Sequence, residues 1–407
     1  MPGALSHLRV LDLSRILAGP WAGQMLADLG ADVIKVERPG VGDDTRGWGP
    51  PWLKDEQGAE TSVAAYYLCA NRNKRSITID ITRPEGQALV RKLAAESDVV
   101  LENFKAGGLK QYGLDYDSLK AVNPRLVYCS ITGFGQDGPY APRAGYDFLI
   151  QGLGGLMSLT GRPDGEEGGG PMKVGVALTD ILTGLYATNA VLAALAWRDK
   201  SGEGQYIDLA LLDVQIACLA NQAMNYLATG QNPKRLGNAH PNIVPYQDFP
   251  TADGYMILAI GNDGQFARFC EAAGQPALAA DPRFATNRAR VENRAVLIPL
   301  LKKLTVERNT GDWIAMLEAL AVPCGPINTL ADVFADPQVV ARGMKVTMPH
   351  PAAGSVPQVA SPMKLSATPV DYRLPPPMLG EHTEAILAGT LGLDAETIAG
   401  LRASGVV

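Results

Sequence analysis

A single acidic side chain interrupts a long apolar stretch near the middle of the chain. Asp180 lies in Gly175-Val-Ala-Leu-Thr-Asp180-Ile-Leu-Thr-Gly-Leu-Tyr186 and is the only formal charge between Lys173 and Arg198. The apolar run Ile181 to Trp197 that follows it predicts a buried helix that starts near the acid. One interpretation of Asp180 is a capping or first-turn acid that the helix dipole favours. The other is a partly desolvated carboxylate that acts as a nucleophile or base.

Basic residues recur near the ends of predicted strands. They are Arg38, Arg72, Lys74, Arg75 and Lys105. In an acidic protein, such cations can hold the phosphates of a ligand. The alternative for each of them is an ordinary solvated surface charge. A phosphorylated cofactor is therefore a reasonable inference, although the spacing of these residues does not identify it.

Several familiar chemical signatures are missing. Ala18-Gly19-Pro20 stands where a dinucleotide-binding glycine motif would follow the first strand, so an NAD-dependent dehydrogenase is not supported. The sequence has neither a nucleophile elbow nor a phosphate-binding P-loop. The four histidines are far apart and the five cysteines have no metal-type spacing, so we expect no metal site.

The elements that must position these residues alternate between strands and helices. Strands are predicted at 9–14, 31–37, 75–81, 98–102 and 126–133, with helices at 20–29 and 84–96 between them. This alternation is typical of an α/β fold with a parallel sheet. In such sheets ligands bind beyond the carboxyl ends of the strands, and several of the candidate basic residues follow those ends.

The rest of the chain has a different character. Residues 144–228 are predicted to be mainly helical, with one strand at 205–209. A strand at 254–260 opens a second, smaller domain with helices near 262–273, 290–305 and 310–320. A helix near 329–335, two strand-like runs and a helical tail at 382–403 complete the chain. The segment 39–55 is expected to be an ordered loop.

The composition excludes some classes of function. The chain has 407 residues, 46% of them hydrophobic and 19% charged, with a net charge of −6. These values are typical of a folded globular protein and argue against a nucleic-acid-binding surface. The N-terminus lacks a signal peptide pattern, and the apolar run after Asp180 is short for a membrane span. The odd number of cysteines predicts buried free thiols in a reducing, cytoplasmic compartment.

Several stretches resemble one family, the class III CoA-transferases. They are Val10-Leu-Asp-Leu-Ser-Arg-Ile-Leu-Ala-Gly-Pro20, Leu29-Gly-Ala-Asp-Val-Ile-Lys-Val-Glu-Arg-Pro39, Gly42-Asp-Asp-Thr-Arg46, Asn73-Lys-Arg-Ser76, Glu102-Asn-Phe104, Gly175 to Gly184, Gly202-Glu-Gly-Gln205, Pro323-Cys-Gly-Pro326 and Leu379-Gly-Glu-His-Thr383. The resemblance runs from near residue 8 to the C-terminus, and the number and order of these motifs make it specific.

The resemblance implies a fold and an assembly. A Rossmann-like large domain with a parallel sheet would comprise residues 1–225 and the returning C-terminal segment 329–407. Residues 226–328 would form a smaller α+β domain with its linker. Two such chains would interlock into a ring-like homodimer.

The resemblance also implies roles for particular residues. Asp180 would be the nucleophile. CoA would be bound by Arg38, Arg72, Lys74, Arg75, Asn103, Lys105 and the backbone at Leu17 and Ala18. Tyr146 and Asp147 would line the substrate site. No tightly bound cofactor is implied, because CoA or acyl-CoA is itself a substrate together with a small carboxylic acid.

The implied reaction proceeds through an aspartyl acyl-anhydride and an aspartyl–CoA thioester. A carboxylate with an ordinary pKa near 3.9 is ionised at pH 7 but is a weak nucleophile. Holding it against the thioester carbonyl can lower the barrier by roughly 7–11 kcal/mol in the best intramolecular cases. A helix N-terminus is expected to favour its charged form.

Some residues depart from the formyl-CoA transferase pattern and point to another branch. That enzyme has a glutamine where this chain has Leu17, and a glycine-rich loop where this chain has Gly237-Asn-Ala-His-Pro-Asn242. The sequence is more similar to the succinyl-CoA:dicarboxylate branch, which includes glutarate CoA-transferases. His240 in this loop would either contact the substrate or brace the loop. Arg15, Arg46 and Arg143 are three candidates to hold a distal carboxylate.

Two alternative functions remain for comparison. An α-methylacyl-CoA racemase would share the fold, but it uses a histidine–aspartate pair, and the histidine position here is Tyr146. A non-catalytic CoA-binding protein is the second alternative, and retention of the acid at position 180 weighs against it.

Overall fold

The computed structural model describes residues 3–407 and divides the chain into two compact units. Of the described residues, unit 1 comprises 3–156, 174–224 and 338–407, and unit 2 comprises 157–173 and 225–337. The sequence prediction assigned residues 157–173 to the large domain and began the C-terminal segment at 329, whereas here residues 157–173 belong to unit 2 and the C-terminal segment of unit 1 begins at 338.

Unit 1 is built on one parallel sheet of six strands in the order β5-β2-β1-β6-β7-β8. The strands are β1 (Arg9–Asp12), β2 (Asp32–Glu37), β5 (Lys74–Thr78), β6 (Val99–Glu102), β7 (Val127–Thr132) and β8 (Tyr206–Ala210). Because β1, β2, β6 and β7 are buried on both faces, their residues form nearly continuous apolar runs rather than alternating ones. The predicted parallel α/β fold is confirmed.

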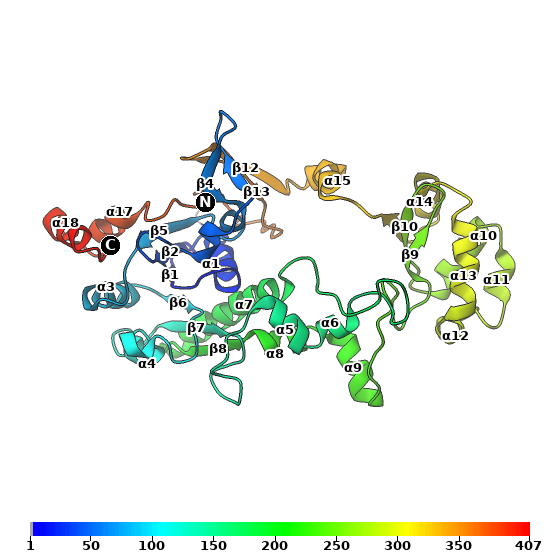
Figure 1. The fold of residues 1–407 in the computed structure, drawn as a ribbon, viewed down its shortest axis with the longest axis horizontal. Helices are drawn as coiled ribbons and strands as arrows, with labels where there is room; N and C mark the ends of the chain where they lie inside the picture. The colour runs from blue at the N-terminus through cyan, green and yellow to red at the C-terminus, as the bar shows by residue number, and fades with distance from the viewer. Residues whose placement is uncertain (1–2) are drawn as a thin grey trace. The chain divides into compact units, whose positions relative to one another are not determined.

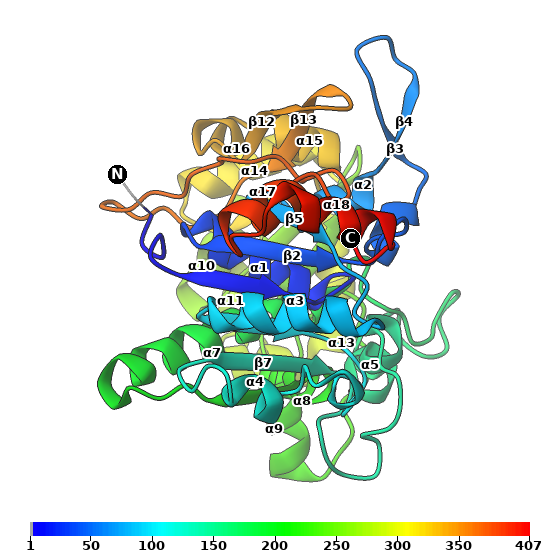
Figure 2. The same cartoon turned by 90° about the vertical axis from the view of Figure 1, so that its left-hand side faces the viewer.

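Helices cover both faces of this sheet (Figure 1). One face packs on α1 (Ala18–Asp28), α5 (Asp147–Leu153), α7 (Leu178–Ser201) and α8 (Leu211–Ala217). The other packs on α3 (Pro84–Ala95), α4 (Tyr116–Lys120), α17 (Thr383–Gly389) and α18 (Ala395–Ala403), which face the viewer in Figure 2. The C-terminal helices thus complete a layer that the N-terminal part begins, which explains why the chain returns to unit 1.

Helix α7 is the long helix of unit 1, and it packs against α1 and β7. By length and composition it is the one helix among residues 3–407 that could span a membrane. Its buried residues include Thr183, Ala187, Val191 and Leu195, which recur every three or four positions as in a helix that covers a sheet. The predicted buried helix after Asp180 is therefore confirmed.

Shorter elements complete unit 1 and the passages between the units. They are the hairpin strands β3 (Trp52–Lys54), β4 (Glu60–Ala64), β12 (Lys345–His350) and β13 (Gly354–Val359), the helices α2 (Ala65–Leu68), α6 (Leu156–Leu159), α9 (Ala220–Thr229) and α16 (Pro337–Ala341), and the 3-10 turns η1 (Asp44–Gly47) and η2 (Lys110–Tyr112). Strand β3 lies within the segment 39–55, which the sequence predicted to be a loop, and it forms a hairpin with β4.

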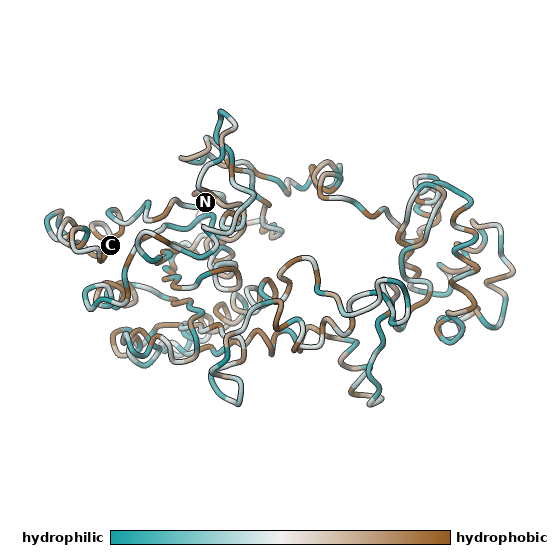
Figure 3. Tube along the Cα trace, in the orientation of Figure 1, coloured by the Kyte–Doolittle hydropathy of each residue, from teal (hydrophilic) through white to brown (hydrophobic). Residues whose placement is uncertain are grey.

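Unit 2 combines a small antiparallel sheet with helices, as expected for an α+β domain. Its elements are β9 (Tyr246–Pro250), β10 (Tyr255–Ala259), β11 (Cys324–Pro326), α10 (Asp263–Ala272), α11 (Pro276–Ala280), α12 (Asn287–Glu292), α13 (Arg294–Thr305), α14 (Thr310–Ala319) and α15 (Leu330–Ala335). Apolar and polar residues alternate along its helices (Figure 3). The apolar residues meet in a core around Phe249, Phe269 and Trp313.

Two details of the sequence prediction need correction. The helical tail is two helices, because residues 390–394 interrupt it. Of the five cysteines, Cys129 and Cys270 are buried, whereas Cys69 is exposed. All five cysteines are free thiols, as predicted, but not all of them are buried.

Candidate active site

A cavity of about 580 Å³ runs along the carboxyl edge of the unit 1 sheet. Its lining includes the segments that follow five strands: Arg15–Ala18 after β1, Arg38 after β2, Ile79–Thr82 after β5, Asn103–Ala106 after β6 and Gly133 after β7. The volume falls within the roughly 300–1,000 Å³ that ligand pockets occupy. The cavity lies where an open α/β sheet is expected to bind a ligand.

Asp180 belongs to the lining of this cavity and is the third residue of α7. It is 9% exposed. Within residues 3–407, no group donates a hydrogen bond to its carboxylate, and no cation pairs with it. A carboxylate that is largely removed from water but unengaged by the protein is available to a substrate in the cavity.

A second carboxylate occupies the helix N-terminus that Asp180 was expected to use. Asp147 Oδ1 accepts the backbone N–H of Thr179 at 2.8 Å and that of Asp180 at 3.3 Å. Gln151 Nε2 donates to the other oxygen, Asp147 Oδ2, at 2.8 Å. Asp147 therefore caps the first turn of α7 from α5, and the amides at this end are already satisfied.

This arrangement changes the protonation of Asp180. Burial raises the pKa of its carboxyl to about 7, and the nearby negative charge of Asp147 acts in the same direction. The sequence-based expectation of a fully ionised carboxylate at pH 7 is thus wrong, because the expected ordinary pKa ignored desolvation. Both protonation states of Asp180 are populated at neutral pH.

The turn between β1 and α1 forms one wall of the cavity and has an unusual backbone. Ile16 has a φ of +72°, a left-handed conformation that a β-branched residue rarely adopts. Its N–H donates to both carboxylate oxygens of Asp43, at 3.2 Å each. The same carboxylate accepts from the backbone N–H and hydroxyl of Thr45 at 3.0 and 2.8 Å. Asp43 thus holds the turn in a conformation that the residue alone would avoid.

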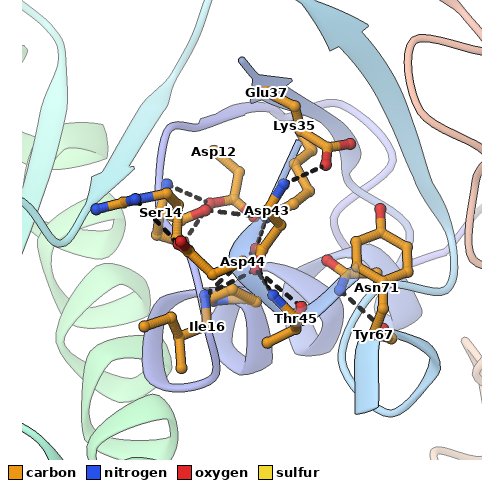
Figure 4. Close-up of polar contacts among 12 residues, drawn as sticks. Asp12, Ser14, Ile16, Lys35, Glu37, Asp43, Asp44, Thr45, Tyr67 and Asn71 are labelled. Atoms are coloured by element: carbon orange, nitrogen blue, oxygen red, sulfur yellow. Dashed lines mark hydrogen bonds and ion pairs between the residues drawn. The ribbon is translucent and has the colours of Figure 1, made fainter. Parts of the chain in front are cut away.

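A buried lysine completes this support (Figure 4). Lys35 is fully buried and donates from Nζ to Asp43 Oδ2 at 2.8 Å and to Ser14 O at 2.9 Å. Burial opposes its charge, but Asp43, Asp12 and Glu37 together raise the pKa of Lys35. Despite its burial, Asp43 has its pKa lowered to about 2 by Lys35 and Thr45. Both groups are therefore charged, and they fix the turn that carries Leu17 and Ala18.

The structure gathers most of the predicted CoA and substrate residues around one cavity. Those that line it are Arg15, Leu17, Ala18, Arg38, Asn103, Lys105, Tyr146 and Asp180. Asn103 also ties two walls together, since its side chain accepts from Arg15 N at 2.8 Å and donates to Arg15 O at 2.7 Å. Asp147 is not part of the lining; it caps the start of α7 next to Asp180.

Three predicted CoA ligands lie elsewhere and have other partners. Lys74 is fully buried and donates to Asp12 Oδ2, Pro20 O and Asn71 Oδ1 at 2.8–3.0 Å, which uses all three of its hydrogens. Arg72 makes a two-pronged ion pair with Asp28. Arg75 makes a similar pair with Asp32, which is the first residue of β2 and lies at the opposite edge of the sheet. Their expected contacts with CoA are corrected to contacts that stabilise the fold.

Arg46, a predicted substrate residue, also has other partners in the protein. Arg46 donates to both oxygens of Glu37, to Tyr67 Oη and to Pro377 O. Its guanidinium stacks on the Tyr67 ring with 3.8 Å between Cζ and the ring centroid. It does not line the cavity, because the buried Glu37 holds it in the wall behind the turn.

His240 lies in unit 2 and braces its own loop. His240 Nδ1 accepts the N–H of Asn242 at 3.0 Å, and its carbonyl accepts from Arg294 at 3.0 Å. Burial and the charge of Arg294 lower the pKa of the His240 imidazole, which favours its neutral form. A contact between His240 and a substrate stays a prediction.

Lys35 and Asp43, which support the turn, are not among the site residues predicted from the sequence. Lys35 sits in an otherwise apolar strand, Val33-Ile-Lys-Val36, and such a charge in a buried strand signals a buried partner. The partner follows eight residues later, in the loop after the strand.

The chain is similar to known CoA-transferases over nearly its whole length. The sequence model of the family described as "CoA-transferase family III" matches residues 5–383 of this chain. A succinate–glutarate CoA-transferase of Agrobacterium fabrum is 56% identical over 384 residues, which are 94% of this chain and 95% of that protein. A succinyl-CoA:glutarate CoA-transferase of Homo sapiens is 44% identical over 403 residues, covering 99% of this chain and 90% of that protein.

Solved structures are similar over the same length. The crystal structure of a CAIB/BAIF family protein from Brucella suis superposes with a TM-score of 0.83 at 56% identity, covering 96% of this chain and all of that one. The similarity therefore covers most of both units.

The link between Asp147 and Asp180 predicts a shift in the pH profile. Asp147→Asn keeps an oxygen that accepts from Thr179 but removes the negative charge, so the ionised form of Asp180 becomes less unfavourable and its pKa falls. In the wild type, we expect kcat/KM for the acyl-CoA to rise with pH through an apparent pKa near 7, that of the Asp180 carboxyl. We expect this acidic limb to move to lower pH in the variant, while Asp117→Asn, an exposed acid, leaves it in place. An unmoved limb in Asp147→Asn would contradict the assignment.

Proposed function

The chain belongs to CoA-transferase family III, and on that premise we propose that it moves CoA between succinyl-CoA and a small dicarboxylate such as glutarate. The observation that carries the proposal is the free, largely buried carboxylate of Asp180 in a cavity at the carboxyl edge of the sheet. The names of the relatives in Agrobacterium fabrum and Homo sapiens support this choice of acids.

The first half of the reaction transfers CoA to the enzyme. The ionised Asp180 carboxylate attacks the thioester carbonyl of succinyl-CoA, the C–S bond breaks, and CoA leaves as a thiolate from a succinyl–aspartyl anhydride. The thiolate then attacks the aspartyl carbonyl. Succinate leaves with the bridging oxygen, and an aspartyl–CoA thioester remains.

The second half reverses these steps with the other acid. A carboxylate of glutarate attacks the aspartyl thioester, which again releases the thiolate and forms a glutaryl–aspartyl anhydride. Attack of the thiolate on the glutaryl carbonyl gives glutaryl-CoA and restores the Asp180 carboxylate. The thioester energy is conserved only if water stays out, and the burial of Asp180 serves this requirement.

The cavity offers binding groups suited to CoA. Arg38 and Lys105 can bind its phosphates, since neither makes an ion pair within the described residues. The turn at Leu17 and Ala18 presents the start of α1 to the same space, and Lys35 and Asp43 hold that turn rigid. In this proposal CoA is a substrate and no cofactor is tightly bound.

The alternative racemase chemistry lacks a base. Racemisation at the α-carbon of an acyl-CoA needs two groups that exchange protons, in the family's case a histidine and an acid. Among the described residues that line the cavity there is no histidine, and the position expected for it is Tyr146. A protein that only binds CoA would not need the buried, unpartnered carboxylate of Asp180, which is unfavourable for folding.

A homodimer is the proposed assembly. Large apolar side chains on α5, α7 and α8 are exposed in the single chain, more than an isolated soluble surface usually carries in one region. They are Phe148, Leu149, Leu153, Tyr186 and Ile216. A second copy that covers these side chains would explain them.

The reaction is tested with a panel of acids and thioesters. We expect the wild type to transfer CoA from succinyl-CoA to glutarate, with mass spectrometry as the readout. Asp180→Asn has the same shape but a far weaker nucleophile, so it should lower kcat by roughly 10³- to 10⁶-fold. Asp199→Asn, an exposed acid on the same helix, serves as the matched control. Transfer by Asp180→Asn at the wild-type rate would refute the proposal.

The assembly is tested by sedimentation. Wild-type protein should sediment as a dimer across micromolar concentrations. Leu153→Glu places a charge on the exposed apolar surface and should shift the equilibrium toward monomers. A wild type that is active and monomeric throughout would rule out the proposed homodimer.

A further inference from the structure

A dicarboxylate substrate has one carboxylate that reacts and one that does not. Burying the second without a partner is unfavourable, so a site that selects dicarboxylates needs a cation at its acyl end. We infer that Arg143 binds this distal carboxylate; the inference rests on the proposed transfer between dicarboxylates. Nothing in the reaction itself requires Arg143, so its role is one of specificity.

The other two arginine candidates are engaged by protein carboxylates. Arg46 is bound on both prongs by Glu37 and lies outside the cavity lining. Arg15 pairs with Asp44 at 2.9 Å. Arg143 lines the cavity, and no carboxylate in residues 3–407 forms an ion pair with it.

The backbone places Arg143 over the end of β7. A Cβ added to Gly145 would lie 2.4 Å from the Cα of Gly133, which directly follows β7, so the segment around Arg143 folds tightly back on the strand end. Four residues beyond Arg143, Asp147 bonds to the backbone of Asp180. Four residues span at most about 14 Å, which keeps Arg143 at the end of the cavity where Asp180 lies.

Two aromatic rings orient the guanidinium. Its Cζ lies 4.4 Å from the ring centroid of Tyr140 and 5.1 Å from that of Phe134. These two rings meet edge to face with centroids 5.6 Å apart. An arginine held against aromatic faces keeps its N–H groups directed outward in its own plane, which suits two-pronged binding of a carboxylate.

The sheet separates Arg143 from the cation that follows β2. Arg38 follows β2 and Arg143 lies over β7, and β1 and β6 run between these strands. Three strand spacings of about 4.8 Å put the two strand ends roughly 14 Å apart. An extended thioester substrate can therefore place phosphates near Arg38 and its acyl group near Asp180 and Arg143.

The test compares two acceptors that differ only at the distal end. Glutarate and pentanoate have the same chain length, but pentanoate has a methyl group in place of the second carboxylate. In a double-displacement reaction, kcat/KM for the acceptor does not depend on the donor. We expect Arg143→Met to lower kcat/KM for glutarate by about 10- to 100-fold, as for loss of a charge-assisted hydrogen bond, and to change that for pentanoate by less than about 2-fold.

Further variants and the donor side complete the test. Arg143→Lys should restore part of the preference because it keeps the charge, and Arg402→Met, an exposed arginine elsewhere, should change neither acceptor. Succinyl-CoA and butyryl-CoA as donors should show the same selective loss. Equal losses on both acceptors, or no loss on glutarate, would overturn the role of Arg143. A wild type that transfers CoA to neither acid would instead overturn the proposed function.

Discussion

The removal of Asp180 from water, without a compensating partner, is the constraint on which the active site depends. Burial raises the pKa of this carboxyl to about 7, and the nearby negative charge of Asp147 acts in the same direction. Asp147 also takes the amide N–H groups at the start of α7, so the helix end satisfies one carboxylate and leaves the other free. The ionised Asp180 is therefore poorly solvated and relatively basic, which makes it a better nucleophile than an ordinary aspartate.

A second set of buried charges fixes the turn between β1 and α1, which forms another wall of the cavity. Lys35 and Asp43 pair at 2.8 Å in the interior and hold Ile16 in its left-handed conformation. Buried ion pairs are weak evidence for stability, because desolvation offsets much of the attraction. Their role here is geometric, since the turn that they hold carries Leu17 and Ala18 beside the cavity. A nucleophile of moderate strength gains most from such rigid placement of the thioester.

Much of the fold follows from local sequence patterns, whereas the site follows only in part. Apolar runs, and a glycine at the end of a helix, predicted the strands of the sheet and the helices between them. The parallel order of the strands then predicted that a ligand would bind at their carboxyl ends, where the cavity lies. The pattern did not reveal that Lys74 and Arg72 are buried in ion pairs. In the sequence, a basic residue near a strand end has the same pattern whether it binds a ligand or pairs with a buried carboxylate. The capping of α7 by Asp147 and the raised pKa of Asp180 are tertiary effects, set by residues 33 positions apart in the chain.

The most direct measurement is to identify the covalent intermediate on the enzyme. Protein incubated with succinyl-CoA is trapped with hydroxylamine, digested and mapped by mass spectrometry. The account predicts that the peptide containing Asp180 carries a hydroxamate on that residue, and that Asp180→Asn protein treated in the same way carries none. An active enzyme with an unmodified Asp180, or with the adduct on another side chain, would contradict it.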